Sequence, residues 1–121
     1  MFGTVARIRP KPGEMQALLD LSKEYDRDRG RRIKGYVADY IFESEKHPGE
    51  YLLVAIFQDR ESYMANAASP EQDAMYRRMR AHLAEDPVWE DGEIILASHG
   101  PAMPAWDDTS GMMGTEPASP E

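Results

Sequence analysis

Apolar positions along the first 99 residues follow two different periods. Four segments read as strands, because they are rich in β-branched and aromatic residues or alternate in polarity; they cover residues 2–9, 36–42, 51–57 and 93–98. Between the first two, Met15, Leu18, Leu19, Ser22 and Tyr25 recur at helical spacing and predict an amphipathic helix over residues 13–29. The third and fourth strands are separated by a stretch with helical features.

Capping and turn residues divide that stretch and bound the other elements. Asp59 is placed as the N-cap of a short helix that runs to about residue 68. Ser69 is placed as the next N-cap, with Pro70 at the first helical position. A third helix with an apolar stripe then extends until Asp86-Pro87; the stripe consists of Met75, Tyr76, Met79, His82 and Leu83. A Pro-Gly turn at residues 48–49 joins two strands that should pair antiparallel.

The predicted order is strand, helix, strand, strand, helix, helix, strand. It fits an α+β fold of ferredoxin-like βαββαβ type, with the helices on one face of a four-stranded antiparallel sheet. We assign this domain to residues 1–99. Residues 100–121 form a Pro/Gly-rich acidic tail without an apolar pattern, which we expect to be mobile beyond Asp107.

One predicted strand indicates a homodimer. Residues 52–57 read Leu-Leu-Val-Ala-Ile-Phe and are apolar on both faces. The helices of one subunit cover only one face of the sheet, so an apolar patch larger than most monomers expose would remain. We therefore expect two subunits to pack through their sheet faces. The alternative is that the tail folds back over this face.

Composition narrows the choice of partners and location. With 22 acidic and 14 basic residues the chain carries a formal charge of −8, which disfavours nucleic acid as a partner. The basic clusters at residues 27–32 and 77–80 are interpreted as solvated surface. There is no cysteine, and no apolar run is long enough for a signal peptide or a membrane span, so we expect a cytoplasmic protein without membrane contact.

Several segments resemble a known family. A first strand ending in Arg-Ile-Arg-Pro-Lys-Pro-Gly (residues 7–13) precedes the first helix, and Gly-Tyr (35–36) opens the second strand. Further on stand Tyr-Leu-Leu-Val-Ala-Ile-Phe-Gln-Asp-Arg-Glu-Ser-Tyr (51–63), Ser-Pro-Glu-Gln (69–72), Leu-Ala-Glu-Asp-Pro-Val-Trp (83–89) and Asp-Gly-Glu-Ile (91–94). Over about residues 1–98 the chain thereby resembles the antibiotic biosynthesis monooxygenase-like family of dimeric α/β barrels.

The resemblance implies a pocket in each subunit between sheet and helices. Some relatives oxidise polyaromatic substrates with oxygen and no cofactor, others open haem, and many have no known activity. Haem-degrading members carry an Asn in the first strand, a Trp after the third strand and a His ligand on the following helix. Here the first strand has no Asn, Phe57 stands near the Trp position and Tyr76 near the ligand position, which argues against haem degradation.

Four residues are candidates for catalysis. His82 lies on the predicted stripe of the last helix, and its side chain titrates near neutrality, so it is a candidate base; the alternative is a histidine that only packs. Tyr36, Tyr40 and Asn66 are candidates for orienting a substrate oxygen. Period-two alternation places Tyr36 and Tyr40 on one strand face. Asp39 is expected either to pair with an arginine such as Arg7 or to enter the pocket.

Four more residues are candidates for substrate binding, because aromatic side chains line pockets for planar ligands; they are Phe42, Tyr63, Tyr76 and Trp89. The alternative is a filled aromatic core. No histidine pair has the spacing of a metal site, and we expect no metal and no cofactor.

The sequence therefore predicts a cofactor-independent monooxygenase-like enzyme acting on a small aromatic or quinol substrate. Two alternatives stay open: a non-catalytic dimer that binds a small ligand, or is related to stress, and a structural interaction module with a filled core.

Overall fold

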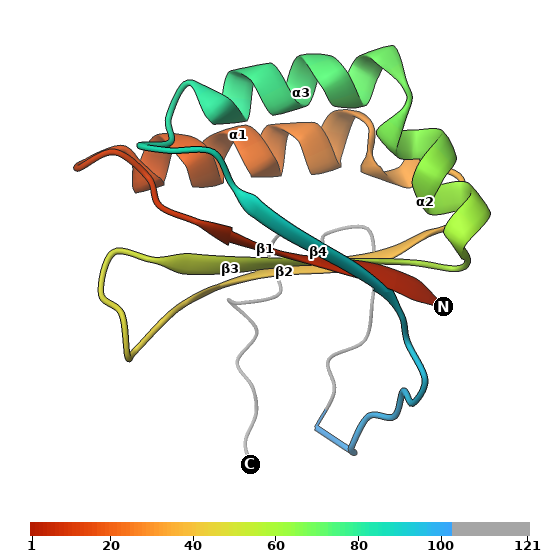
Figure 1. Ribbon diagram of the computed structural model, residues 1–121. Helices are drawn as coiled ribbons and strands as arrows, with labels where there is room; N and C mark the ends of the chain where they lie inside the picture. The colour runs from red at the N-terminus through yellow and green to blue at the C-terminus, as the bar shows by residue number, and fades with distance from the viewer. Residues whose placement is uncertain (103–121) are drawn as a thin grey trace.

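The computed structural model describes residues 1–102 and contains four strands and three α-helices in two layers (Figure 1). The elements in chain order are β1 (Phe2–Ile8), α1 (Met15–Asp28), the 3₁₀ turn η1 (Gly30–Arg32), β2 (Tyr36–Glu43), β3 (Tyr51–Phe57), α2 (Arg60–Ala67), α3 (Pro70–Arg80) and β4 (Val88–Glu93). The strands form one antiparallel sheet in the order β2-β3-β1-β4. The predicted ferredoxin-like α+β fold is confirmed.

Capping residues fix the helix starts as predicted. The Asp59 carboxylate accepts a hydrogen bond from the backbone N–H of Ser62 at 2.8 Å and caps α2. The Ser69 hydroxyl accepts one from the N–H of Gln72 at 3.1 Å and caps α3, with Pro70 at its first position. Each cap satisfies a backbone donor that the helix itself leaves free.

The hydrophobic core lies between the helices and one face of the sheet. Its buried members from β1 are Ala6 and Ile8; Leu18 and Leu21 of α1, Met79 of α3 and Leu83 pack against them. Because side chains alternate along a strand, Phe2 and Thr4 share this helix-facing side of β1, while Val5 and Arg7 point to the opposite side. The register with the neighbouring strands extends this division across the whole sheet.

The opposite face, which we call the open face, is largely apolar. Residues that pair across the strands share a side, so the register places its apolar members as Val5, Ala38, Tyr40, Phe42, Leu52, Val54, Ile56 and Val88. Phe42 is 51% exposed and Val88 65% exposed. No helix covers this face within residues 1–102 (Figure 1).

The last strand was predicted wrongly. It runs over Val88–Glu93, where Glu93 pairs with Phe2 and Val88 with Arg7, instead of over residues 93–98. Backbone pairing with β1 forms this edge strand, and all six of its residues are exposed, so it carries little apolar signal. Ile95 and Leu96, which suggested the strand, are 94% and 83% exposed beyond its end.

The last helix is also shorter than predicted. It ends at Arg80, so His82 lies in the turn that follows and not on the helix. The cause is a competing backbone pairing: Lys11 donates its N–H to the carbonyl of His82, and Ala84 donates to the carbonyl of Arg9. Leu83 is thereby drawn fully into the core. Residues 103–121, most of the predicted tail, lie outside the described part of the chain.

Candidate functional site

Asp26, Tyr36 and Asp39 come together on the helix-facing side of β2. Asp26 lies in the last turn of α1, on the side that faces the sheet. Tyr36 opens β2 and Asp39 pairs with Ala55 of β3, whose other partner is the buried Thr4. Gly30 lies between them: a Cβ built on it would be 3.7 Å from the Asp26 Oδ1 and 3.9 Å from the Tyr36 ring.

A β-bulge explains why Tyr36 and Asp39 share a side. Tyr36 pairs with Phe57 and Ala38 with Ile56, so Val37 is an extra residue in β2. Strict alternation would place Tyr36 and Tyr40 on the same face of the strand, as the sequence predicted. The bulge puts them on opposite faces, so that prediction is wrong. Tyr40 pairs with Val54 and belongs to the open face.

Burial and mutual charge perturb all three groups. Burial and, to a smaller extent, the negative charge of the nearby Asp39 carboxylate together raise the pKa of Asp26 to about 7. Burial also raises the pKa of Asp39, while a hydrogen bond from the Tyr36 hydroxyl acts against this rise. The pKa of Tyr36 is raised by burial and then by the charges of Asp39 and Asp26. At neutral pH the site therefore holds a half-ionised carboxyl group beside a firmly protonated phenol.

An aromatic row extends from this cluster across the sheet. The Tyr36 ring packs on Phe57 with centroids 5.8 Å apart, Phe57 on Tyr63 at 5.5 Å, and Tyr63 on Phe2 at 5.2 Å. The Tyr63 hydroxyl donates to the Asp91 carboxylate at 3.1 Å, and the pKa of Tyr63 is raised, chiefly by burial. Carboxyl groups and a phenol at one end of an aromatic wall are suited to hold a planar hydroxylated molecule and to remove its proton.

The other predicted residues lie elsewhere. His82 Nδ1 is 2.9 Å from the Glu14 carboxylate, just before the start of α1, whereas Asp26 lies near its end. Asp26 follows Glu14 by twelve positions along the helix, which corresponds to about 18 Å. The Nδ2 of Asn66 donates to Gln72 between α2 and α3 at 3.3 Å. His82 and Asn66 therefore belong to neither the acidic cluster nor its aromatic row.

The predicted binding residues are likewise spread over the molecule. Only Tyr63 belongs to the aromatic row. Phe42 lies on the open face, Tyr76 packs against the hydrophobic core, and Trp89 lies on β4 and is 42% exposed. The predicted pocket combining these residues with His82 is not assembled in one subunit.

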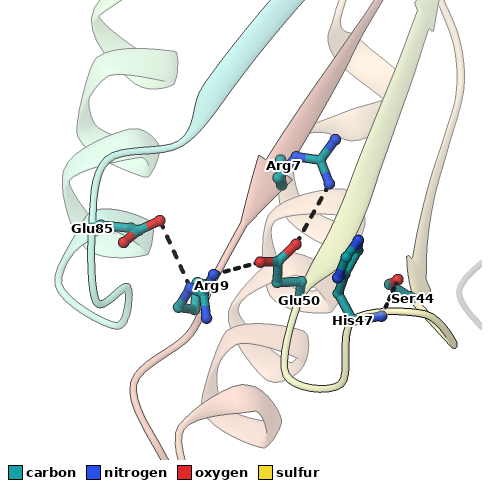
Figure 2. Close-up of polar contacts among 6 residues, drawn as sticks. All are labelled: Arg7, Arg9, Ser44, His47, Glu50 and Glu85. Carbon is teal, nitrogen blue, oxygen red and sulfur yellow. Dashed lines mark hydrogen bonds and ion pairs between the residues drawn. The ribbon is translucent and has the colours of Figure 1, made fainter.

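Arg7 is not the partner of Asp39. The structure places Arg7 on the open face, where it donates to Glu50 at 3.5 Å (Figure 2). Arg9 also pairs with Glu50 and lies 3.7 Å from the Glu85 carboxylate. Asp39 instead lies on the helix-facing side of the sheet, and its entry into a substrate pocket stays a prediction.

Sequence reasoning missed Asp26. Its signal is present, because Met15, Leu19, Ser22 and Asp26 follow one another at spacings of four, three and four residues. A carboxylate that continues an apolar stripe is a candidate for a perturbed pKa. Among residues 1–102, no three His, Asp or Glu side chains gather in a way that would hold a metal ion, and no helix is long and apolar enough to cross a membrane.

Comparison with known proteins gives a consistent family. The family model described as antibiotic biosynthesis monooxygenase matches residues 1–78. A crystal structure of an antibiotic biosynthesis monooxygenase superposes with a TM-score of 0.64 at 20% identity, covering 79% of this chain and all of that one. A Caulobacter crescentus protein provisionally given the same name reaches 0.69 at 15% identity, over 78% of this chain and 90% of that one.

A protein of unknown function from Nitrosomonas europaea superposes equally well. Its TM-score is 0.66 at 20% identity, over 87% of this chain and 95% of that one. No curated protein matches the chain in sequence. At these identities the structural likeness shows the fold, and the activity has to be argued from the site.

Proposed function

Since the chain belongs to the antibiotic biosynthesis monooxygenase family, we propose that it is a cofactor-independent monooxygenase-like enzyme that acts on a small hydroxylated aromatic or quinol substrate. The substrate would lie between α1 and the sheet, against the aromatic row. The observation that carries the proposal is the carboxyl group of Asp26. With a pKa of about 7 and a place beside that row, it is suited to act as a general base at neutral pH.

The chemistry needs a base, an anion-stabilising donor and oxygen. Asp26 takes the proton of the substrate hydroxyl, and the Tyr36 hydroxyl, which stays protonated, donates to the oxyanion that forms. The electron-rich anion passes electrons to O₂, a C–O bond forms at a ring carbon, and the resulting hydroperoxide loses water. A hydroxyarene and O₂ thus give a quinone and water: one oxygen atom enters the ring, and the other leaves with two substrate hydrogens.

This proposal gives the role of base to Asp26, whereas the sequence favoured His82. Both assignments are tested by oxygen uptake with a panel of hydroxylated aromatics and dihydroquinones between pH 5 and 9. If Asp26 is the base, uptake by the wild type increases with pH with a midpoint near 7, and Asp26→Asn loses on the order of 10²–10⁴ of the rate. His82→Ala and the exposed control Asp20→Asn then keep it.

Other outcomes of this assay have a defined meaning. Loss of uptake in His82→Ala but not in Asp26→Asn would return the role of base to His82. Thermal stabilisation by the same compounds without oxygen uptake above the spontaneous rate would favour the alternative, a non-catalytic dimer that binds a small ligand. If no compound causes either oxygen uptake or thermal stabilisation, the enzymatic proposal and the ligand-binding alternative are both contradicted.

We propose further that a second copy of this chain covers the open face. Val5, Phe42 and Val88 expose 43%, 51% and 65% of their surface there, and Ile95 and Leu96 extend from the adjacent edge strand. In Figure 1 the segment after β4 turns to the side of the sheet away from the helices. A second sheet packed on this face would bury these side chains, each worth about 1.5–3 kcal/mol when fully buried.

Substitutions at two equally exposed sites test whether the chain forms this dimer. Val5 on the open face and Met64 on α2 are each 43% exposed. Val5→Glu is expected to convert a dimer into a monomer, because it places a charge between the two sheets, while Met64→Glu leaves the dimer intact. Light scattering after size exclusion gives the mass of each. A wild-type monomer, or a dimer that both variants retain, would refute the proposal.

A further inference from the structure

A cavity of about 400 Å³ lies where the segment after α1 meets α2 and the start of α3. The residues of its wall that carry the argument are Arg29, Arg32, Lys34, Ser62, Asn66 and Ser69. None of Asp26, Tyr36, Asp39 and the aromatic row lines it, so it is separate from the site proposed for oxidation. A volume of this order fits a small organic molecule.

Two residues of this wall each have a buried side-chain atom without a hydrogen-bond partner among residues 1–102: the Nε of Arg29 and the Oδ1 of Asn66. Nearly all buried polar groups in proteins are paired, so a buried donor and a buried acceptor on one cavity indicate a missing partner. The Asn66 Nδ2 donates to Gln72 Oε1 at 3.3 Å, and this oxygen also accepts from the Tyr25 hydroxyl at 3.1 Å; in this arrangement the Asn66 Oδ1 is left without a donor.

Both serines of the wall and the Asp59 carboxylate are already engaged in hydrogen bonds. Ser69 accepts from the N–H of Gln72 and donates its hydroxyl to the carbonyl of Asn66 at 2.7 Å. Ser62 donates to the carbonyl of Asp59 at 3.1 Å, and the Asp59 carboxylate caps α2. The Arg29 Nε and the Asn66 Oδ1 are thus buried polar atoms that these hydrogen bonds leave without a partner.

Charge favours an anion at this place. The wall contains three cations, Arg29, Arg32 and Lys34, and two carboxylates, Asp59 and Glu61, in a chain whose overall charge is −8. Arg29 forms a long ion pair, 3.9 Å from Glu71. The basic run at residues 27–32, interpreted from sequence as solvated surface, thus supplies two side chains to a cavity.

The wall is built rigidly at its α2 side. Gly35 has φ of +79°, and a Cβ on it would lie 2.3 Å from Ser62 Oγ, so only glycine permits this close approach. Gln58 donates its N–H to the carbonyl of Gly35 at 2.7 Å and holds the same loop to β3. The backbone on this side of the cavity therefore does not depend on a loop closing.

We propose that this cavity binds a small organic oxyanion that carries a hydroxyl or amino group next to its charge. The Arg29 guanidinium takes the carboxylate or phosphate oxygen, with Lys34 and Arg32 adding attraction at the rim. The Asn66 Oδ1 accepts the hydrogen bond of the hydroxyl or amino group. Each of the two orphaned atoms thereby obtains the partner that its chemistry requires.

Calorimetric titration with two matched pairs of probes tests the proposal. Malate differs from succinate by the hydroxyl group, as glycerol 3-phosphate differs from propyl phosphate. We expect the hydroxylated member of at least one pair to bind saturably and at least tenfold more tightly than its partner. The pair that responds identifies the anion as carboxylate or phosphate.

Variants assign the two contacts. Arg29→Lys keeps the charge but removes Nε, and is expected to weaken binding at least tenfold; Asn66→Ala is expected to abolish the advantage of the hydroxyl group. Arg27→Gln, an exposed member of the same basic run outside the wall, should bind like the wild type. If a variant fails to fold, NMR of the wild type provides the test instead. The Arg29 Nε–H resonance should then shift as the probe is titrated.

The outcomes are distinct from those of the oxidation assay, because no oxygen uptake is involved. No saturable binding of any of the four probes would overturn the proposal. Equal affinity within both pairs, or unchanged affinity in a folded Arg29→Lys, would overturn it as well.

Discussion

Replacing Asp26 by asparagine should stabilise the protein at alkaline pH and have little effect near pH 4. The folded protein holds the proton of Asp26 up to a pKa of about 7, whereas the unfolded chain releases it near 3.8. The stability contributed by the protonated carboxyl group is thus fully present below 3.8 and is lost as pH rises through 7. Asparagine cannot ionise, so the variant escapes this loss.

The magnitude follows from the difference between the two pKa values. One pKa unit corresponds to about 1.4 kcal/mol, so the full difference would be about 4 kcal/mol. Asp26 is only half-buried and solvent screens part of its charge, which reduces our expectation to about 2 kcal/mol at pH 8.

Urea unfolding at pH 4, 6 and 8, at one protein concentration, measures this difference. Asp26→Asn should unfold at higher urea than the wild type at pH 8, and the gap should shrink steadily toward pH 4. Asp20→Asn, an exposed site on the same helix, controls for the loss of one negative charge from an acidic chain. A gap that is the same at all three pH values, or that Asp20→Asn reproduces, would refute the assigned environment of Asp26.

Three further substitutions probe the frame around the sites. Gly35→Ala should cost more than about 2 kcal/mol in chemical unfolding, because it combines positive φ with a clash against Ser62, and an unchanged stability would contradict that contact. Leu83→Ala should lower the free energy of unfolding by about 2–5 kcal/mol, since the side chain is completely buried; a loss below 1 kcal/mol would mean that the turn repacks. Thr4→Val removes the hydroxyl that donates to Asp91 at 2.6 Å, so the amides of β4 should exchange hydrogen faster while those of β3 do not.

The fold was predictable where local chemistry and periodicity agree. Asp59 and Ser69 cap helices because of short-range hydrogen bonds that the sequence alone displays. The last strand was not predictable in this way. An exposed edge strand is defined by its pairing with β1, which is a long-range backbone interaction, and the apolar Ile95 and Leu96 drew the prediction past its end.

The site was less predictable than the fold. Membership of Tyr36 and Asp39 in one cluster depends on the extra residue Val37, and a bulge leaves no signal in an alternating pattern. The role of Asp26 depends on burial, which a helical stripe suggests but does not establish. His82 was favoured because its ordinary pKa lies near neutrality, whereas the structure reaches that range with a buried carboxyl group.

The bulge at Val37 lets one short strand carry two independent sets of residues. Before it, Tyr36 looks inward; after it, Asp39 looks inward while Tyr40 and Phe42 look outward. Under the two functions proposed above, inward residues such as Asp39 would affect substrate binding and outward residues such as Phe42 would affect self-association, so separate point substitutions in this strand could change each one. Deleting Val37 would remove the bulge without changing these directions, because Tyr36, Ala38 and Asp39 would then alternate regularly opposite Phe57, Ile56 and Ala55.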